Sequence, residues 1–138
     1  MSNGSSFRTC GIAVLRIVVG VVFLMHGWQK FSMGFHNVGG FLESLRIPIP
    51  QLAAVVLTLV EFFGGIALIV GFLTRGVALL LAFDMAVAIL TVHIKHGFFS
   101  SGGGIEFPLT LLAANLCLLF SGAGPISVDS FMGKKRVE

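Results

Sequence analysis

Apolar runs long enough to cross a lipid bilayer are the feature that most constrains this sequence. A helix that spans the hydrocarbon needs about 20 largely apolar residues. We predict four spans from the apolar runs at about residues 12–31, 52–72, 77–96 and 107–120, of which the fourth is the shortest. The mean hydropathy of +1.00 and the 11% of charged residues exclude an ordinary water-soluble domain. We therefore predict an all-α fold, an integral membrane four-helix bundle in contact with the lipid bilayer, in which residues 1–138 form a single transmembrane domain.

The segments between these runs carry residues that start, end or pack helices. Proline in "IPIP" at residues 47–50 suits the first turn of a helix, because that turn needs no amide donor. The "GFLTRG" stretch at residues 71–76 indicates a short turn. The glycines of "EFFGG" would let the second helix pack closely against a neighbour. Between Asn37 and Arg46, apolar residues recur at helical spacing, which predicts a short interfacial helix in the first outer loop.

Positive residues predict the orientation in the membrane, because lysine and arginine concentrate in cytoplasmic loops. With four spans both termini share one side. That side carries Arg8, Arg16, Arg75 and the tail Lys134–Arg136, and the other side carries Lys30, Arg46 and Lys95. We expect the side of the termini to be the cytoplasm. The formal charge of +3 needs no nucleic acid as a partner, since a basic tail beside anionic lipid accounts for it.

The two cysteines limit the redox chemistry that this chain can perform alone. Cys10 and Cys117 form no CxxC pair, so a membrane thiol–disulfide oxidoreductase would lack its working thiols. Four thiolates for an iron–sulfur cluster are not available from one chain.

Ionisable residues inside the spans need partners, because a charge at the centre of a membrane helix costs at least about 2.5 kcal/mol. Asp84 lies about 12 Å and Arg16 roughly 6 Å from the cytoplasmic ends of their helices, at 1.5 Å per residue. Because the arginine side chain is long, we predict a structural ion pair between Arg16 and Asp84.

A second group of polar residues falls in the outer half of the predicted bundle. His26 and Lys30 are four residues apart and share a helix face, and Glu61 lies at a depth where His26 could meet it. At 100° per residue, His93 stands about 180° from Asp84 and belongs to another neighbourhood. We predict an outer pocket that binds a ligand or handles protons, walled by Trp28, Phe98 and Phe99 and formed by His26, Lys30, Glu61, His93, His96 and Glu106.

Structural roles compete with this prediction. Lys95 and His96 end a helix, where cations complement the helix dipole. The stretch "HIKHGFFSSGGGIEFP" at residues 93–108 also has the composition of a plain turn between helices. A metal site is disfavoured because no His-x3-His or HExxH spacing occurs, and a haem between His26 and His93 is no better supported.

The ordered motifs "LRIVVGVVFLMHGWQKF", "GGFLESLRIPIP", "EFFGGIALIVGFLTRGVALLLAFDMAVAILTVHIKHGFF" and "GGGIEFPLTLLAANLCLLFSGAGPISVD" resemble the DoxX family of small bacterial membrane proteins over about residues 11–130. The resemblance implies a four-helix protein of the bacterial inner membrane. The family is named for its similarity to the small subunit of an archaeal thiosulfate:quinone oxidoreductase, and relatives are associated with redox or oxidative-stress complexes. In the family, a tyrosine often follows the glutamate that corresponds to Glu106, and this chain has Phe107 at that position.

Two functions from different classes follow. In the first, the protein is a non-catalytic or quinone-binding subunit of a membrane redox complex, and His26, Glu61 and His93 handle protons while a partner enzyme subunit passes electrons. In the second, the bundle is a small-solute or proton transporter or channel. Four helices are few for alternating access, so this function favours a homo-oligomer.

Overall fold

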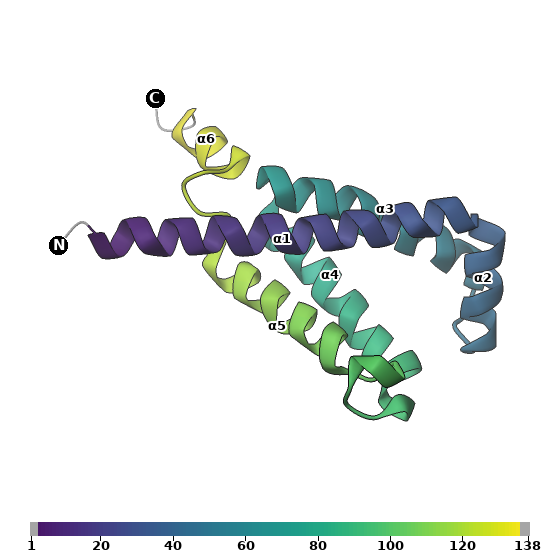
Figure 1. Cartoon of the computed structure of the whole chain (residues 1–138). Helices are drawn as coiled ribbons and strands as arrows, with labels where there is room; N and C mark the ends of the chain where they lie inside the picture. The colour runs from purple at the N-terminus through teal and green to yellow at the C-terminus, as the bar shows by residue number, and fades with distance from the viewer. Residues whose placement is uncertain (1–2, 136–138) are drawn as a thin grey trace.

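The computed structural model describes residues 3–135 as helices joined by short turns, with no strand among them (Figure 1). Its elements are α1 (Asn3–Met33), α2 (Phe35–Ser44), α3 (Pro50–Val70), α4 (Thr74–Ala88), the π-helical turn η1 (Ile89–His93), the 3-10 turns η2 (Ile94–His96) and η3 (Ser100–Gly102), α5 (Glu106–Ser121) and α6 (Val128–Lys135). The predicted all-α membrane bundle is confirmed. Arg136, the last residue of the predicted basic tail, lies outside the described residues.

Within residues 3–135, three segments are long and apolar enough to cross a membrane, namely Ser6–Met33, Pro50–Val70 and Thr74–His96. They match the first three predicted spans, except that the second span, predicted to reach residue 72, ends at Val70. The fourth predicted span corresponds to α5, a shorter apolar helix of 16 residues. Many of the large apolar side chains on these helices are exposed, as expected where lipid rather than water surrounds the chain.

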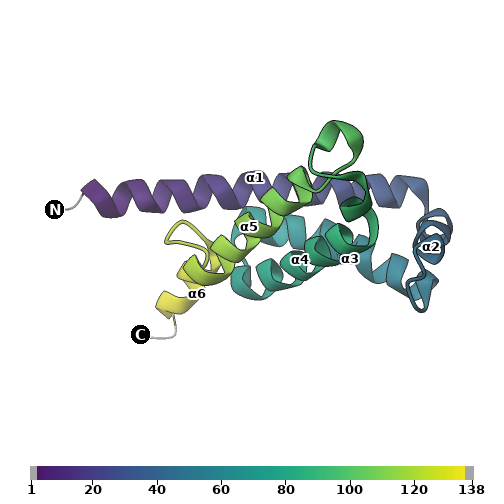
Figure 2. The same ribbon diagram turned by 90° about the horizontal axis from the view of Figure 1, so that it is seen from below.

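Helices α1 and α3 form one closely packed pair, as the views in Figures 1 and 2 and the contacts agree. Glycines on both helices make this approach possible. A Cβ atom added at Gly20 would lie 2.7 Å from the carbonyl oxygen of Gly65, and one added at Gly27 would lie 2.5 Å from the amide nitrogen of Phe62. The predicted role of "EFFGG" in close packing is therefore confirmed at Gly65, because no side chain larger than hydrogen fits between these backbones.

Helices α4 and α5 form the second pair and diverge from α1 and α3 (Figure 1). The two pairs meet near the chain termini, where Val19, Leu68, Ala78 and Leu118 belong to one buried apolar cluster. They separate toward the end of the molecule that carries α2, which we call the α2 end. The bundle is therefore packed at the end near the chain termini, which we call the terminal end, and open at its α2 end.

Helix α2 confirms the predicted short helix in the first loop. It crosses the end of α1 and packs on the first turns of α3, where Val38, Leu42 and Ala54 form a small buried cluster. Pro50 occupies the first turn of α3, as the "IPIP" motif predicts.

The turn between α3 and α4 is held by a segment from far along the chain. Gly71 ends α3 with φ +73°, and the side-chain oxygens of Asp129 accept hydrogen bonds from the backbone N–H groups of Leu73 (2.7 Å) and Thr74 (2.9 Å). Asp129 thus caps the N-terminus of α4 from α6, a helix that the sequence pattern does not predict.

Candidate functional site

A cavity of about 810 Å3 occupies the opening between the two helix pairs. Residues from α1, α2, α3, α4, η1, α5 and the loop before α5 line it. Most of the lining is aromatic or aliphatic and includes Phe23, Phe41, Leu57, Phe83, Phe107 and Leu111. A cavity of this size and character suits an apolar molecule of drug-like dimensions.

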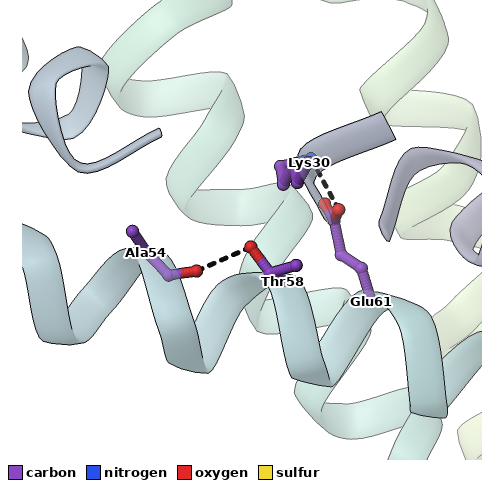
Figure 3. A network of polar contacts seen from close by, with 4 residues as sticks. All are labelled: Lys30, Ala54, Thr58 and Glu61. Atoms are coloured by element: carbon purple, nitrogen blue, oxygen red, sulfur yellow. Dashed lines mark hydrogen bonds and ion pairs between the residues drawn. The ribbon is translucent and has the colours of Figure 1, made fainter. Parts of the chain in front are cut away.

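An ion pair between α1 and α3 lies in the wall of this cavity. The Nζ of Lys30 donates a hydrogen bond to Oε2 of Glu61 over 2.5 Å (Figure 3), and the side chains are 21% and 5% exposed. Glu61 lies in the middle of α3, where an unpaired carboxylate would be costly. Sequence reasoning suggests His26 as the partner of Glu61. The structure gives that position to Lys30, whose longer side chain reaches the carboxylate from the last turn of α1.

Thr58 lies one turn before Glu61 on α3 and is fully buried. Its hydroxyl donates to the backbone oxygen of Ala54 over 2.7 Å (Figure 3). The hydroxyl hydrogen is therefore used within its own helix, and Thr58 is not part of the cavity lining.

Asp84 on α4 completes a three-charge cluster. Its carboxyl lies within hydrogen-bonding reach of the Glu61 carboxyl and within electrostatic range of Lys30. Asp84 also lines the cavity. We refer to Lys30, Glu61 and Asp84 as the charged triad.

The predicted ion pair between Arg16 and Asp84 is wrong. Arg16 is 2% exposed and donates hydrogen bonds to the backbone oxygens of Ala123 (2.6 Å) and Ile126 (2.8 Å), at the terminal end. The prediction used only the depth of each residue along its own helix. It did not include the segment after α5, which folds back so that its carbonyl groups contact this guanidinium. These carbonyls accept from both terminal nitrogens of Arg16, while its buried Nε has no hydrogen-bond partner among residues 3–135.

His26 and His93 both line the cavity. The ring centroid of His26 is 6.2 Å from that of Phe107. The Nδ1 of His93 donates to the backbone oxygen of Gly103 over 2.7 Å, which leaves its Nε2 as the hydrogen-bond acceptor of a neutral ring.

The predicted separation of His93 from Asp84 does not hold, since both residues line one cavity. The reason is the π-helical turn η1 between them. A π-helical turn contains more residues than an α-helical turn, so each residue rotates by less than 100° and His93 moves back toward the face of Asp84.

The other predicted pocket residues lie outside the cavity lining. His96 bonds the backbone oxygen of Val92 through Nδ1 (2.9 Å), and the carboxylate of Glu106 accepts from the N–H of Ser100 (2.9 Å). Glu106 thus closes the loop before α5. The predicted wall residues Trp28, Phe98 and Phe99 are more than half exposed and do not line the cavity.

Sequence reasoning missed Asp84 as a cavity residue and the aromatic wall residues Phe23, Phe41, Phe83 and Phe107. Asp84 carries a usable signal, because it is a membrane-embedded carboxyl. The phenylalanines carry none, since 14 phenylalanines are spread along the chain. Among residues 3–135, no three histidine, cysteine, aspartate or glutamate side chains are arranged to hold a metal ion.

Comparison with known proteins gives consistent matches. The DoxX family model matches residues 11–94. A Bacillus subtilis protein named "Putative oxidoreductase CatD" is 34% identical over 91% of this chain and 91% of its own length. The Escherichia coli inner membrane proteins YqjF and YphA are 34% and 30% identical, over 91% and 86% of this chain and 94% and 87% of their own lengths. No solved structure matches the chain.

Proposed function

Because this chain belongs to the DoxX family of membrane proteins, we propose that it is a quinone-binding subunit of a membrane redox complex, with the 810 Å3 cavity as its binding site. The observation that carries this proposal is the combination of an apolar cavity and a charged triad within the bundle. A quinone has an apolar body and ring oxygens that accept hydrogen bonds. The apolar body suits the phenylalanine lining, and the ring oxygens suit the Lys30 ammonium as a hydrogen-bond donor.

The charged triad and the two histidines would handle protons at this site. Reduction of a quinone to a quinol takes up two protons and two electrons. His26, Glu61 and His93 line the cavity and can exchange protons with a bound ring oxygen. The electrons would come from a partner enzyme subunit, and the printed name of the Bacillus subtilis relative supports an oxidoreductase role.

We further propose that the protein resides in the bacterial inner membrane with both termini in the cytoplasm. The names of the Escherichia coli relatives support the compartment, and the Arg8 and Arg75 side of the bundle supports the orientation. Reporter fusions at the C-terminus and in the loop at residues 97–105 test the orientation. Cytoplasmic activity only at the C-terminus is the expected result, and the reverse pattern would contradict it.

A blocked cavity tests the binding site. Val56 on α3 is 51% exposed and lines the cavity, whereas Leu52 on the same helix is 57% exposed and does not. We expect Val56→Trp to reduce binding of a decyl-substituted benzoquinone to the reconstituted protein at least tenfold, with Leu52→Trp binding like the wild type. Equal binding by both variants, or no binding by the wild type, would refute the quinone site.

The alternative function, a small-solute or proton transporter, is favoured by one observation. The triad places two carboxyls and one ammonium inside the bundle, an arrangement suited to a transported proton or cation. Four helices would favour a homo-oligomer for this role. Proton or solute flux into proteoliposomes, abolished by Glu61→Gln, would establish transport, and its absence with intact quinone binding would exclude it.

A further inference from the structure

The charged triad has one more carboxyl than it has cations. Lys30 on α1 pairs with Glu61 on α3, and Asp84 on α4 adds a second carboxyl beside Glu61. Lys30 can neutralise only one of the two. The remaining negative charge lies in a part of the chain surrounded by apolar side chains, where an uncompensated charge is costly.

The atomic contacts point to how this charge is neutralised. The Oδ2 atom of Asp84 is buried and receives no hydrogen bond from any residue in the range 3–135. Its carboxyl faces that of Glu61, and two ionised carboxylates only accept hydrogen bonds. A single proton turns one carboxyl into a donor, converts the repulsive contact into a hydrogen bond and removes the surplus charge. Carboxyl pairs elsewhere solve the same problem by sharing a proton.

We propose that Asp84 and Glu61 form a proton-binding site that holds one exchangeable proton between them, with Lys30 as its fixed counter-ion. This site concerns a proton and stands whether or not the cavity binds a quinone. It replaces the structural role that sequence reasoning gives to Asp84.

The surroundings of the site allow the proton to exchange. Both carboxyl residues line the cavity, and so do the titratable side chains His26 from α1 and His93 from η1. From α2 and α5, which also contribute to the lining, come only apolar side chains at this cavity: Phe41, Leu42, Phe107, Pro108 and Leu111. The histidines are therefore the titratable side chains of the lining, outside the charged triad, that could pass the proton to and from the pair.

The helix that carries Asp84 is irregular just beyond it. The α-helical pattern of α4 ends at Ala88, and η1 follows as a π-helical turn. Such turns are rare and occur frequently at functional sites. Here the turn brings His93 to the cavity that Asp84 lines, which is what a proton path between these two side chains requires.

Infrared spectroscopy on the full chain reconstituted in lipid tests the proposal. We expect a carbonyl band of a protonated carboxyl group at neutral pH, lost in both Asp84→Asn and Glu61→Gln. Glu106→Gln is the matched control, because Glu106 lies outside the cavity lining and caps a loop, so its variant should keep the band. A wild-type protein without the band, or a band that persists in both cavity variants, would overturn the proposal.

A labelling experiment on the unmodified sequence keeps the test valid if these variants fail to fold. A hydrophobic carbodiimide adds to protonated carboxyls in apolar surroundings. Peptide mass spectrometry of the labelled wild-type protein should find the adduct on Glu61 or Asp84, reduced at least tenfold at strongly alkaline pH. No adduct on either residue after exhaustive labelling at neutral pH would overturn the shared proton.

Discussion

The two ends of the bundle each bury a charged residue, and they satisfy it in opposite ways. At the terminal end, Arg16 donates to two backbone oxygens in a packed environment. At the α2 end, the charged triad lines a cavity of about 810 Å3 and contains a surplus carboxyl. A charge matched by fixed carbonyls holds a structure together. A cluster with a surplus charge beside an open space is suited to a ligand or a proton.

The largest expected effect on stability is at Arg16. Arg16→Leu leaves the carbonyls of Ala123 and Ile126 without their donor, and we expect the free energy of unfolding to fall by about 3 kcal/mol, the scale of two hydrogen bonds to a charged group. Titration with a denaturing detergent in mixed micelles measures this loss. Arg8→Leu, on the same helix but exposed, is the control. Equal effects of the two substitutions would show that the terminal end is not held by Arg16.

The glycine contact between α1 and α3 gives the next largest effect. A Cβ at Gly65 would overlap the backbone of Leu24, so Gly65→Ala should destabilise the protein by about 1–3 kcal/mol through overpacking. The adjacent Gly64 is a close control, because a Cβ there would lie 3.4 Å from Val77, an ordinary contact. Gly64→Ala should be neutral or stabilising in the same unfolding titration. The opposite order of the two variants would contradict the packing described for this pair.

Asp129 should give a smaller loss. Asp129→Ala removes the oxygens that cap α4 and should cost about 1 kcal/mol, as for other helix caps. Asp129→Asn retains one acceptor oxygen and should recover part of the loss. Thermal unfolding in detergent compares both with Glu43→Ala, an exposed carboxylate on α2. A loss no greater than that of Glu43→Ala would show that the cap contributes nothing.

The smallest effect on stability is expected in the cavity wall. Phe83 is 70% exposed and lines the cavity, so Phe83→Ala should change the free energy of unfolding by less than about 0.5 kcal/mol. It should nevertheless weaken binding of a decyl-substituted benzoquinone severalfold. Phe120→Ala, 75% exposed on α5 and outside the cavity, should change neither quantity. A large loss of stability in Phe83→Ala would mean that the α2 end is packed as tightly as the terminal end.

The sequence predicts the helices well because their signals are local. The apolar runs, Pro50 and the "GFLTRG" turn place α3, α4 and α5 within a few residues of where they lie. The site is harder to predict because its contacts join distant segments. The acceptors of Arg16 lie 107 and 110 residues away along the chain. They are backbone oxygens, which every residue carries, so residue types do not identify them. The π-helical turn before Ile94 shifts His93 by a rotation that ideal helix geometry does not include.

The long sequence separation between Arg16 and its acceptors has a consequence for biogenesis. Translation delivers α1 to the membrane first, whereas Ala123 and Ile126 are synthesised only after helices α2, α3, α4 and α5. Until then the arginine in α1 lacks its native acceptors and must remain near water or lipid headgroups, so α1 cannot settle at its final depth. Completion of the segment after α5 would therefore release α1 to its native position. The assembled protein and a nascent chain stalled within α5 should differ in how deeply their first helix is inserted.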